Sequence, residues 1–555
     1  MSLLYLLIVI PLLAAGAIAF FPSRNARAIA AIGSLVPIGP MLVALWKFDW
    51  SRGGDLQFVG SYDWIADMGL RVGVGVDSVS LLLIALTVLL GPICVFGSFS
   101  AVKDNPKVFY GWLTGLQAAM VGVFAATDLL VFYVCFEFTL LPLYVLINLY
   151  GSSNRKRAAT KFFLYTFTGS IIALAGLVYV VFHHRSLEGV WTFDIPTLAT
   201  TAMQMPVEAQ ALVLLALMLG FAVKVPLFPV HTWLPLAHTE APTAGSVILA
   251  GVLLKLGTYG IYRFALGFVP EAVIAYAPLI AVLSIIGIIY AGLICWVQKD
   301  VKKLVAYSSV SHLGFCVLGL VALNNIGLTG SVLYMINHGL STGALFLCIG
   351  MVYERFHTRS MDELGGLAST MPIWSSFMVF FVMASVGLPG LNGFVSEFMC
   401  IIGTFQSSPA WVLEGREGAA GGSLGPWFAF AAGFGVIVAA MYLLYMTGRV
   451  VWGTARQPAG HDDEHSELPK DLNAREISLL TVLAVGCLGL GVYPTPVIEA
   501  IEPSVERTLE PYQDLLQIRA EELGIRADAD EPRLVEPGVG EPPADDPSES
   551  QEGGQ

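Results

Sequence analysis

Four ionisable side chains lie in the middle of long apolar segments of this chain. Glu137 lies in LLVFYVCFEFTLLPLYVLI, Lys224 in LVLLALMLGFAVKVPLFPV, Lys255 in GSVILAGVLLKLGTYGIY and Glu397 in GLNGFVSEFMCIIGTF. A charge at the centre of a lipid bilayer costs about 3 kcal/mol, so it persists where it faces the protein interior or a wet cavity. Two acids and two bases at that depth predict a route for protons or other ions through a membrane protein.

Two histidines lie at similar positions within apolar segments. His312 lies in AYSSVSHLGF and His338 in LYMINHGLST. Imidazole can pass protons near neutral pH, so both are predicted to act as relays, although a histidine in a membrane helix can also serve as a helix-to-helix contact. His231 and His238 flank the end of another apolar segment and are candidates for a cytoplasmic entry. The remaining histidines are expected to be solvated loop residues: His183, His184, His357, His461 and His465.

Each of these polar side chains could also have a purely structural role. The four charges could form buried structural ion pairs or polar helix contacts. The presence of four such charges near the middle of the membrane favours the transport interpretation. Asp77 and Asp128 begin apolar segments and are interpreted as helix caps.

The composition is that of a membrane protein. Of 555 residues, 56% are hydrophobic and 13% are charged. Apolar runs of about 18 residues or more predict membrane-spanning helices. The fold class is therefore all-α and polytopic. The first run has no basic region before it and is interpreted as a retained helix rather than a signal peptide. The sequence predicts 14 spans: 3–21, 28–46, 78–99, 109–126, 128–150, 159–182, 209–235, 241–266, 271–295, 302–323, 328–351, 371–406, 426–451 and 475–498.

The basic residues indicate an orientation. If the N-terminus is outside, most lysines and arginines fall in cytoplasmic loops, as the positive-inside rule requires. Arg263 is assigned to an outer loop. An even number of spans then puts both termini on the outer side, and the expected location is the plasma membrane of a bacterium.

Two spans carry helix-breaking residues beside a central charge. Span 7 contains Pro226 and Pro229 just after Lys224, and span 12 contains Pro389 and Gly390 just before Glu397. Broken backbone at membrane depth is tolerated where it is buried in protein or lines water. Spans 7 and 12 are therefore predicted to be discontinuous.

The spacing of these breaks indicates a repeat. Spans 4–8 and 9–13 form two sets of five, each with the broken helix fourth. Because five is odd, the two sets enter the membrane from opposite sides, which predicts two inverted five-helix repeats. The expected domains are a three-helix segment at 1–108, repeats at 109–266 and 271–451, a last span at 475–498, and an acidic, largely disordered tail at 499–555. The stretch Pro503–Leu523 could form a short amphipathic helix.

The chain lacks motifs for redox or nucleotide chemistry. All seven cysteines lie in apolar spans without a CxxC pair, and no GxGxxG or P-loop motif has a suitable context. No basic patch points to nucleic acid. We therefore expect no cofactor or metal in this chain.

Several segments together resemble a known family. These are GVDSVSLLLIALT, the segment around Glu137, FAVKVPLFPVHTWLPLAHTEAPTAGSVILAGVLLKLGTYGIYR, DVKKLVAYSSVSHLGF and GLPGLNGFVSEF. They resemble the antiporter-like membrane subunits of complex I, the proton-pumping NADH–quinone oxidoreductase. The resemblance runs from about residue 1 to 498.

The resemblance implies a role for each candidate residue. Glu137 and Lys224 would be the family's glutamate–lysine pair, Lys255 the bridging lysine, His312 and His338 the central relay, and Glu397 the terminal acid of the second half-channel. NADH, FMN, iron–sulfur clusters and quinone would be bound by partner subunits. The expected partners are the lipid bilayer and other membrane-arm subunits, with the antiporter-like chains L and N as neighbours.

The predicted function is proton translocation along this mid-membrane axis, coupled to quinone reduction elsewhere in the complex. Two alternatives stay open. One is a subunit of a multisubunit sodium/proton antiporter, which gene neighbours would distinguish. The other is a structural subunit whose buried charges take no part in transport.

Overall fold

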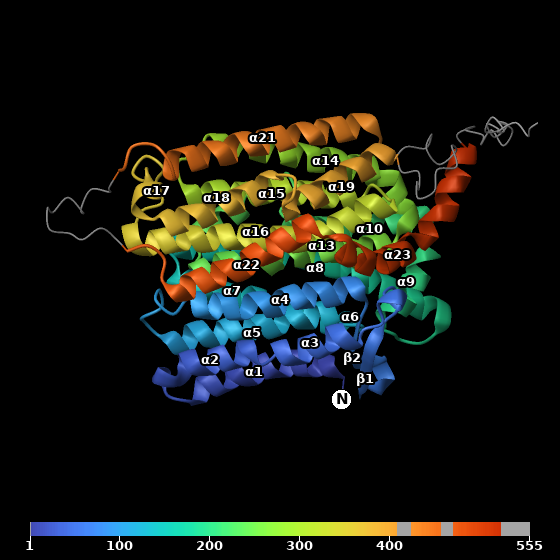
Figure 1. The fold of residues 1–555 in the computed structure, drawn as a ribbon. Helices are drawn as coiled ribbons and strands as arrows, with labels where there is room; N and C mark the ends of the chain where they lie inside the picture. The colour runs from blue at the N-terminus through green and yellow to red at the C-terminus, as the bar shows by residue number, and fades with distance from the viewer. Residues whose placement is uncertain (1, 408–422, 457–469, 523–555) are drawn as a thin grey trace, which may run out of the picture.

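The computed structural model describes residues 2–407, 423–456 and 470–522. In that part of the chain, thirteen helical segments are long and apolar enough to cross a membrane, and one shorter apolar helix accompanies them. They lie side by side along a common direction (Figure 1). The all-α, polytopic class is thus confirmed, whereas the count of 14 spans and the inverted repeats stay predictions.

The N-terminal part combines five helices with a hairpin that the sequence analysis did not predict. Its helices are α1 (Leu3–Phe20), α2 (Ala26–Leu35), α3 (Ile38–Lys47), α4 (Ser78–Gly97) and α5 (Pro106–Ala125). Strands β1 (Gln57–Ile65) and β2 (Leu70–Val76) form an antiparallel pair at one end of the helices. We call this end the hairpin end.

Span 7 is interrupted as predicted, and the span after it is irregular. The first repeat region contains α6 (Leu129–Phe138), α7 (Leu140–Tyr150), α8 (Arg155–Glu188), α9 (Ile195–Met203), α10 (Val207–Lys224) and α11 (Leu234–Glu240). The next span consists of α12 (Thr243–Ile248), a π-turn η4 (Leu249–Leu253), α13 (Leu254–Gly260) and a π-turn η5 (Ile261–Leu266). The chain between α10 and α11 is not helical, because its prolines cannot donate the backbone hydrogen bonds of a helix.

Span 12 is also interrupted. The second region contains α14 (Pro270–Trp296), α15 (Val301–Leu320), α16 (Asn325–Phe356), α17 (Leu367–Thr370), α18 (Pro372–Val386), α19 (Asn392–Gln406) and α21 (Pro426–Val450). Gly387 and Gly390, both at positive φ, lie between α18 and α19. Such φ values suit glycine, so the break follows directly from the sequence.

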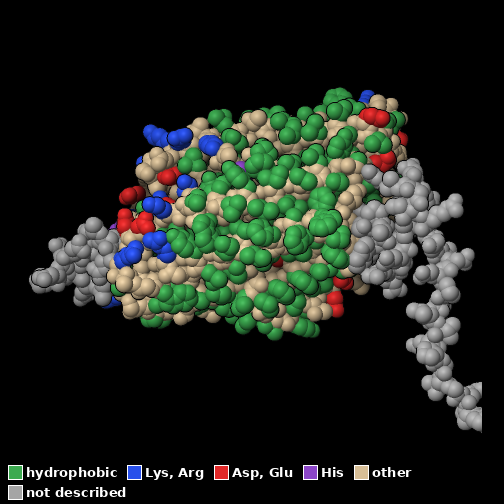
Figure 2. All heavy atoms as spheres, turned by 90° about the horizontal axis from the view of Figure 1, so that it is seen from above, with side chains coloured by type: hydrophobic (Ala, Val, Ile, Leu, Met, Phe, Trp, Pro, Cys, Tyr) green, Lys and Arg blue, Asp and Glu red, His purple; other side chains and the backbone are tan. Residues whose placement is uncertain are grey.

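The helices that carry the central polar residues form the core. The most apolar stretches of Thr243–Leu266 and Asn325–Phe356 are entirely buried, whereas only 28% of the residues of α1 are buried. Apolar side chains cover the flank seen in Figure 2, and lysines and arginines gather at one end of it. We call that end, opposite the hairpin end, the basic end. It contains Lys103, Lys302, Arg355 and Arg359.

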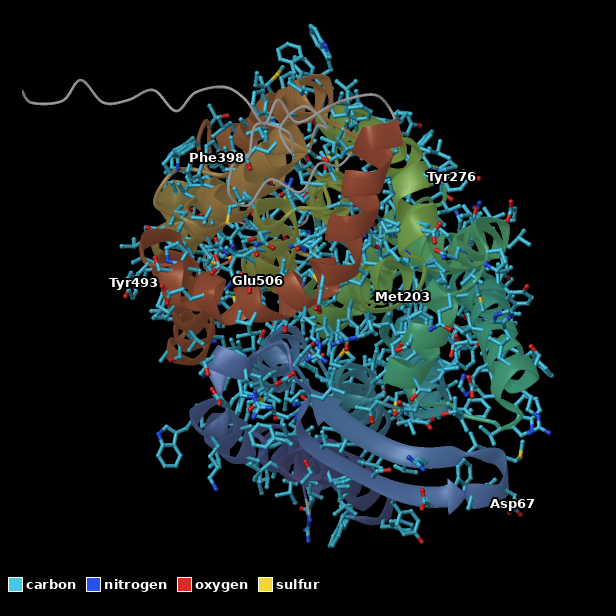
Figure 3. All side chains as sticks on the ribbon, turned by 90° about the vertical axis from the view of Figure 1, so that its right-hand side faces the viewer. Asp67, Met203, Tyr276, Phe398, Tyr493 and Glu506 are labelled. Atoms are coloured by element: carbon cyan, nitrogen blue, oxygen red, sulfur yellow. The ribbon has the colours of Figure 1, made fainter. Side chains whose placement is uncertain are left out.

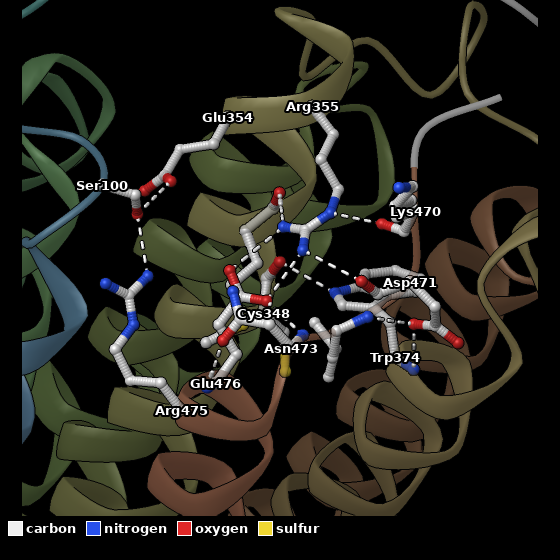
Figure 4. Close-up of polar contacts among 12 residues, drawn as sticks. Ser100, Cys348, Glu354, Arg355, Trp374, Lys470, Asp471, Asn473, Arg475 and Glu476 are labelled. Carbon is white, nitrogen blue, oxygen red and sulfur yellow. Dashed lines mark hydrogen bonds and ion pairs between the residues drawn. The ribbon is translucent and has the colours of Figure 1, made fainter. Parts of the chain in front are cut away.

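Helix α22 (Ala474–Val492) is tied to the basic end by a network around Arg355 (Figure 4). Arg355 pairs with Glu476 at 2.7 Å and donates to the carbonyl of Lys470 at 2.8 Å. The Asp471 carboxylate accepts from the amide of Ile373 at 2.7 Å. These contacts join α16, α18 and α22 where their ends meet.

Helix α23 (Thr495–Glu522) contains most of the stretch for which the sequence analysis allowed a short amphipathic helix. It runs across the hairpin end, over the ends of several spans (Figure 3). Ile501, Val505 and Tyr512 are buried, and the Tyr512 hydroxyl donates to the carbonyl of Leu266 at 2.8 Å. The short amphipathic helix considered for Pro503–Leu523 is thus part of α23, and the disorder expected from 499 does not hold for 499–522, because apolar residues at helical spacing pack against the bundle. Residues 523–555 lie outside the described part.

An ion pair fixes α23 to the loop before the hairpin. Arg507 pairs with Asp55, which also binds Arg52. The Arg52 guanidinium, together with Arg507, holds the pKa of Asp55 below its usual value. Asp55 therefore stays ionised and keeps this contact at neutral pH.

Three further expectations change at the residue level. His183 and His184 lie on α8 instead of in a loop, and His184 is buried with Nδ1 2.7 Å from Thr201 Oγ1. Arg263 lies in the π-turn η5 and pairs with Asp77, so it is not a loop residue. His357 is exposed as expected, whereas His461 and His465 lie outside the described residues.

Candidate functional site

The first polar group surrounds the end of α10. Lys224 is the last residue of this helix and is buried. Its Nζ donates to Thr139 Oγ1 at 3.3 Å and lies 4.5 Å from the centre of the Phe136 ring. Thr139 marks the junction of α6 and α7. A hydroxyl and an aromatic face therefore hold the ammonium group.

Glu137 belongs to the same group but does not touch Lys224. The two side chains interact electrostatically, yet the ion pairs of the described residues include no Glu137–Lys224 contact within 4.0 Å. The Glu137 Oε1 atom is buried without a hydrogen-bond partner, and Tyr133 and Ser170 are its polar neighbours. The two charges therefore lie near each other without a direct ion pair.

The second group begins at Lys255, between the two π-turns. A π-turn leaves backbone carbonyls without their usual helical partners and often marks a functional position. The Nζ of Lys255 donates to the carbonyl of Ala250 and lies 2.7 Å from His338 Nδ1. Gly251 and Gly339 permit this contact, because a Cβ on Gly339 would lie 2.9 Å from the Gly251 carbonyl oxygen. Small residues let the two helices approach closely.

The second group continues from His338 to Glu397. The rings of His338 and His312 are 6.2 Å apart. His312 Nδ1 lies 2.9 Å from Glu397 Oε1. The Tyr334 hydroxyl donates to the same carboxylate oxygen and lies 2.8 Å from His312 Nδ1. On the other side of the imidazole, the Tyr442 hydroxyl lies 3.3 Å from Nε2.

A pair of asparagines aligns the broken span with α16. Asn337 Nδ2 donates to the carbonyl of Asn392 at 2.7 Å, and Asn392 Nδ2 donates to the carbonyl of Asn337 at 3.1 Å. Asn392 is the first residue of α19. The pair therefore fixes the start of α19, one turn before Glu397, against the residue next to His338.

The two groups adjoin at Gly257. A Cβ at this position would lie 3.0 Å from the Lys224 Cβ and 2.8 Å from the Val225 amide nitrogen. Gly257 is two residues after Lys255 on α13. The end of α10 thus packs directly on the helix that carries Lys255.

The structure brings together most of the predicted residues and adds several that the sequence analysis missed. Lys255, His338, His312 and Glu397 form one buried group, and the other consists of buried Lys224 and half-buried Glu137. Asp77 and Asp128 cap α4 and α6 as expected. The missed residues are Thr139, Tyr334 and Tyr442. Tyr334 precedes His338 by four residues on a helix, a spacing that places both on one face and could have revealed it.

His231 and His238 are both buried but lie in different surroundings. His231 packs near Phe228 and Tyr290, with ring centres 5.9 and 6.0 Å away. His238 stacks on Phe346 at 4.5 Å, with both ring nitrogens lacking a hydrogen-bond partner. Their assignment to a cytoplasmic entry stays a prediction.

No metal centre is formed by the described residues, among which no group of three or more His, Cys, Asp or Glu side chains could hold an ion. The seven cysteines are all free, and six of them are buried. The site thus consists of groups that exchange protons or donate hydrogen bonds.

Comparisons with known proteins identify the family. The family model described as NADH:quinone oxidoreductase/Mrp antiporter, TM, matches residues 126–415. NADH-quinone oxidoreductase subunit M of Rhodobacter capsulatus is 38% identical over 523 residues, covering 92% of this chain and 97% of that protein. This chain belongs to the family of NADH-quinone oxidoreductase subunit M. Subunit M of Pseudomonas aeruginosa is 41% identical over 442 residues, covering 79% of this chain and 82% of that protein.

Two solved structures share the fold of this chain. A chain of respiratory complex I from Thermus thermophilus with bound NADH matches with a TM-score of 0.79 at 28% identity, covering 92% of this chain and 99% of its own length. A chain of the Mrp complex from Dietzia sp. matches with a TM-score of 0.75 at 22% identity, covering 93% and 98%. The Mrp likeness concerns the fold alone.

Proposed function

We propose that this chain translocates protons as a membrane-arm subunit of NADH–quinone oxidoreductase. The observation that carries the proposal is the buried series from Lys255 through His338 and His312 to Glu397, in which neighbouring groups are in hydrogen-bonding contact or have rings 6.2 Å apart. Buried groups of this kind can exchange protons, because each can gain or lose one. The identity to subunits M supports the assignment to that complex.

The switch in this mechanism is the first group. When Glu137 approaches Lys224, the carboxylate stabilises the ammonium ion. When it withdraws, Lys224 keeps only Thr139 and the Phe136 ring, so a proton leaves more readily towards Lys255. His338 and His312 pass the proton on, and Glu397 releases it on the outer side.

The complex supplies the remaining chemistry. NADH, FMN, iron–sulfur clusters and quinone are bound by partner subunits, and chains L and N are the lateral neighbours. The chain lies in the plasma membrane of a bacterium with both termini on the outer side. A sodium/proton antiporter subunit is the second candidate, favoured by the fold it shares with the Mrp complex.

Two measurements test the proposal. Purification in mild detergent is expected to recover this chain with NADH-dehydrogenase subunits, whereas recovery with small antiporter subunits alone favours the second candidate. In proteoliposomes containing the whole complex, Glu397→Gln is expected to block proton transfer through this chain, because an amide cannot release the proton. Wild-type protons per NADH in that variant would make Glu397 a structural residue.

A further inference from the structure

A groove runs along the outside of the helix bundle between α1 and α5. The two helices pack against each other (Figure 1), and the groove beside their contact has a volume of about 550 Å³. Small residues line its length, Ala15 and Ala19 on α1 and Gly111 and Gly115 on α5. Because none of them has a side chain larger than a methyl group, the space beside them stays open.

The groove extends from the basic end to the middle of the membrane. Its deep end is formed by Leu12, halfway along α1, and by Phe138, the last residue of α6. Its mouth includes Ser23, eleven residues after Leu12. At 1.5 Å per helical residue this separation is about 16 Å, close to half of the roughly 30 Å thickness of the hydrocarbon layer. The groove therefore has the length of one leaflet.

The deep part of the groove is apolar and faces lipid. Leu12, Val108 and Phe138 are exposed, and the Trp112 ring lies against that of Phe138 with their centres 6.5 Å apart. An empty groove would leave these side chains without van der Waals contacts on one side. A flexible hydrocarbon chain can fill such a space and restore the contacts.

The mouth of the groove is positively charged. Lys107 lines it together with Ser23 and Asn105. The two segments that form the mouth, 22–27 and 103–107, contain a single acid, Asp104, which is not among the lining residues. They contain four bases: Arg24, Arg27, Lys103 and Lys107.

Much of this charge is uncompensated. The ion pairs of the described residues include neither Arg24 nor Lys107. Helix α5 begins at Pro106, so the positive end of its dipole points to the mouth. A phosphate group placed there would meet a lysine, a helix N-terminus and the side chains of Ser23 and Asn105.

Hydrogen bonds fix the backbone at the mouth. The Tyr150 hydroxyl donates to the carbonyl of Asn105 at 2.7 Å. Arg27 donates to the carbonyl of Val102, also at 2.7 Å. These contacts tie the chain before α5 to the end of α7 and the start of α2. The mouth is therefore formed before any ligand binds.

We propose that this groove binds an anionic phospholipid from the leaflet at the basic end. One acyl chain fills the groove as far as Leu12 and Phe138, and the phosphate binds Lys107 and the N-terminus of α5. Phe138 directly follows Glu137, so the acyl chain also packs against the helix that carries this carboxylate. The site lies outside the polar groups described above and does not depend on the proposed function.

A membrane helix of a neighbouring subunit fits the groove less well. A helix is about 10–12 Å wide with its side chains and crosses both leaflets. The groove ends at mid-depth, and residues as small as Gly111 and Ala15 approach each other closely along it. Its dimensions are those of a single hydrocarbon chain.

Photolabelling of the whole complex tests the site directly. The probe is phosphatidylglycerol with a diazirine in one acyl chain, added to purified complex from which lipid has been removed. After illumination, mass spectrometry is expected to find the label in peptides containing residues 12–19 and 108–115. Unlabelled phosphatidylglycerol should displace the probe, whereas phosphatidylcholine should compete at least about fivefold less well, because it has no net charge.

Two variants each remove one half of the site. Lys107→Glu reverses the charge at the mouth and is expected to lower the labelling at least about fivefold, the factor for losing one basic contact with an anionic lipid. Gly111→Phe should lower it similarly. Its Cβ would lie 3.7 Å from the nearest atom, Ile18 Cγ2, which is an ordinary contact, and its ring would occupy the groove. The matched controls, Lys47→Glu at the hairpin end and Gly39→Phe with no atom within 4 Å of its Cβ, should label as the wild type does.

Three results would overturn the proposal. Absence of label from both peptides in the wild type would mean that another subunit covers the groove. Equal competition by phosphatidylcholine would mean that the mouth does not select an anionic headgroup. Unchanged labelling in the assembled Lys107→Glu complex would exclude a phosphate contact there. The competition experiment uses the wild type, so it decides the question even if a variant fails to assemble.

Discussion

Replacing Tyr334 by Phe tests the central group with the removal of a single oxygen atom. The Tyr334 hydroxyl donates to Glu397 Oε1 and lies 2.8 Å from His312 Nδ1. A hydrogen bond to a charged group contributes about 1.5–3 kcal/mol. Since about 1.4 kcal/mol corresponds to a factor of ten, losing it shifts the distribution of a proton between Glu397 and His312 by roughly 10- to 150-fold.

The expected result is a loss of coupling without a loss of assembly. Phenylalanine keeps the ring, which makes edge-on contacts with His312 and His338 at 6.3 and 6.4 Å between centres. The assay is proton translocation relative to NADH oxidation in proteoliposomes, with the amount of assembled complex measured in parallel. We expect coupled translocation to fall about tenfold or more, following the shift worked out above.

A matched variant controls for the change of residue type. Tyr276 is half-exposed on α14 and points away from the bundle (Figure 3). Tyr276→Phe removes the same oxygen from the surface and should behave as wild type. If Tyr334→Phe also pumps at the wild-type rate, the Tyr334 hydroxyl has no part in proton transfer, and the link between His312 and Glu397 does not depend on it.

Substitutions at three further positions, Glu137, Lys224 and Gly257, probe the first group. Glu137→Gln should nearly abolish coupled NADH oxidation in membranes while the complex still assembles. Glu137→Asp should have a milder effect because it keeps the charge. Equal activity of Glu137→Gln and the wild type would rule out a switch at this position. Lys224→Arg should impair translocation strongly, since arginine stays protonated, so a fully active Arg variant would exclude proton release there. Gly257→Ala should weaken coupling in the same proteoliposome assay, because its Cβ would press on the Val225 amide nitrogen at 2.8 Å, whereas Gly433→Ala, with open space around it, should be silent.

Features that arise from the chemistry of single residues or short segments could be predicted from the sequence. A charge in an apolar segment is costly wherever the segment lies, so Lys224, Lys255 and Glu397 could be identified without a structure. Proline and glycine interrupt a helix through their own backbone chemistry, so the breaks after Lys224 and before Glu397 were predictable too. The burial of both lysines follows from the same cost.

Features that depend on packing could not be predicted in this way. The π-turns around Lys255 contain no proline, and nothing in LAGVL or IYRFAL specifies the extra residue that a π-turn accommodates. Thr139 and Tyr442 become relevant because distant helices bring them to Lys224 and His312. The burial of α23 likewise depends on the surface formed by the ends of other helices.

The depth of the polar groups determines where the membrane potential acts. His312 is the twelfth residue of the 20-residue helix α15, and His338 the fourteenth of the 32-residue helix α16. Lys255 lies midway along Thr243–Leu266, and Glu397 near the start of α19, which completes a broken span. Transfers between these residues therefore run nearly parallel to the membrane plane.

A proton that moves within that plane crosses almost none of the membrane potential. Moving one charge across the whole membrane costs about 2.3 kcal/mol for each 100 mV. In the proposed mechanism, the work against the potential thus falls on the steps at the two ends of the axis, entry of the proton and its exit from Glu397. A single hydrogen bond to a charged group, at about 1.5–3 kcal/mol, is of the same size as the whole cost at 100 mV. Rearranging one such contact, that between Tyr334 and Glu397, is therefore sufficient to open or close the exit of the proposed route.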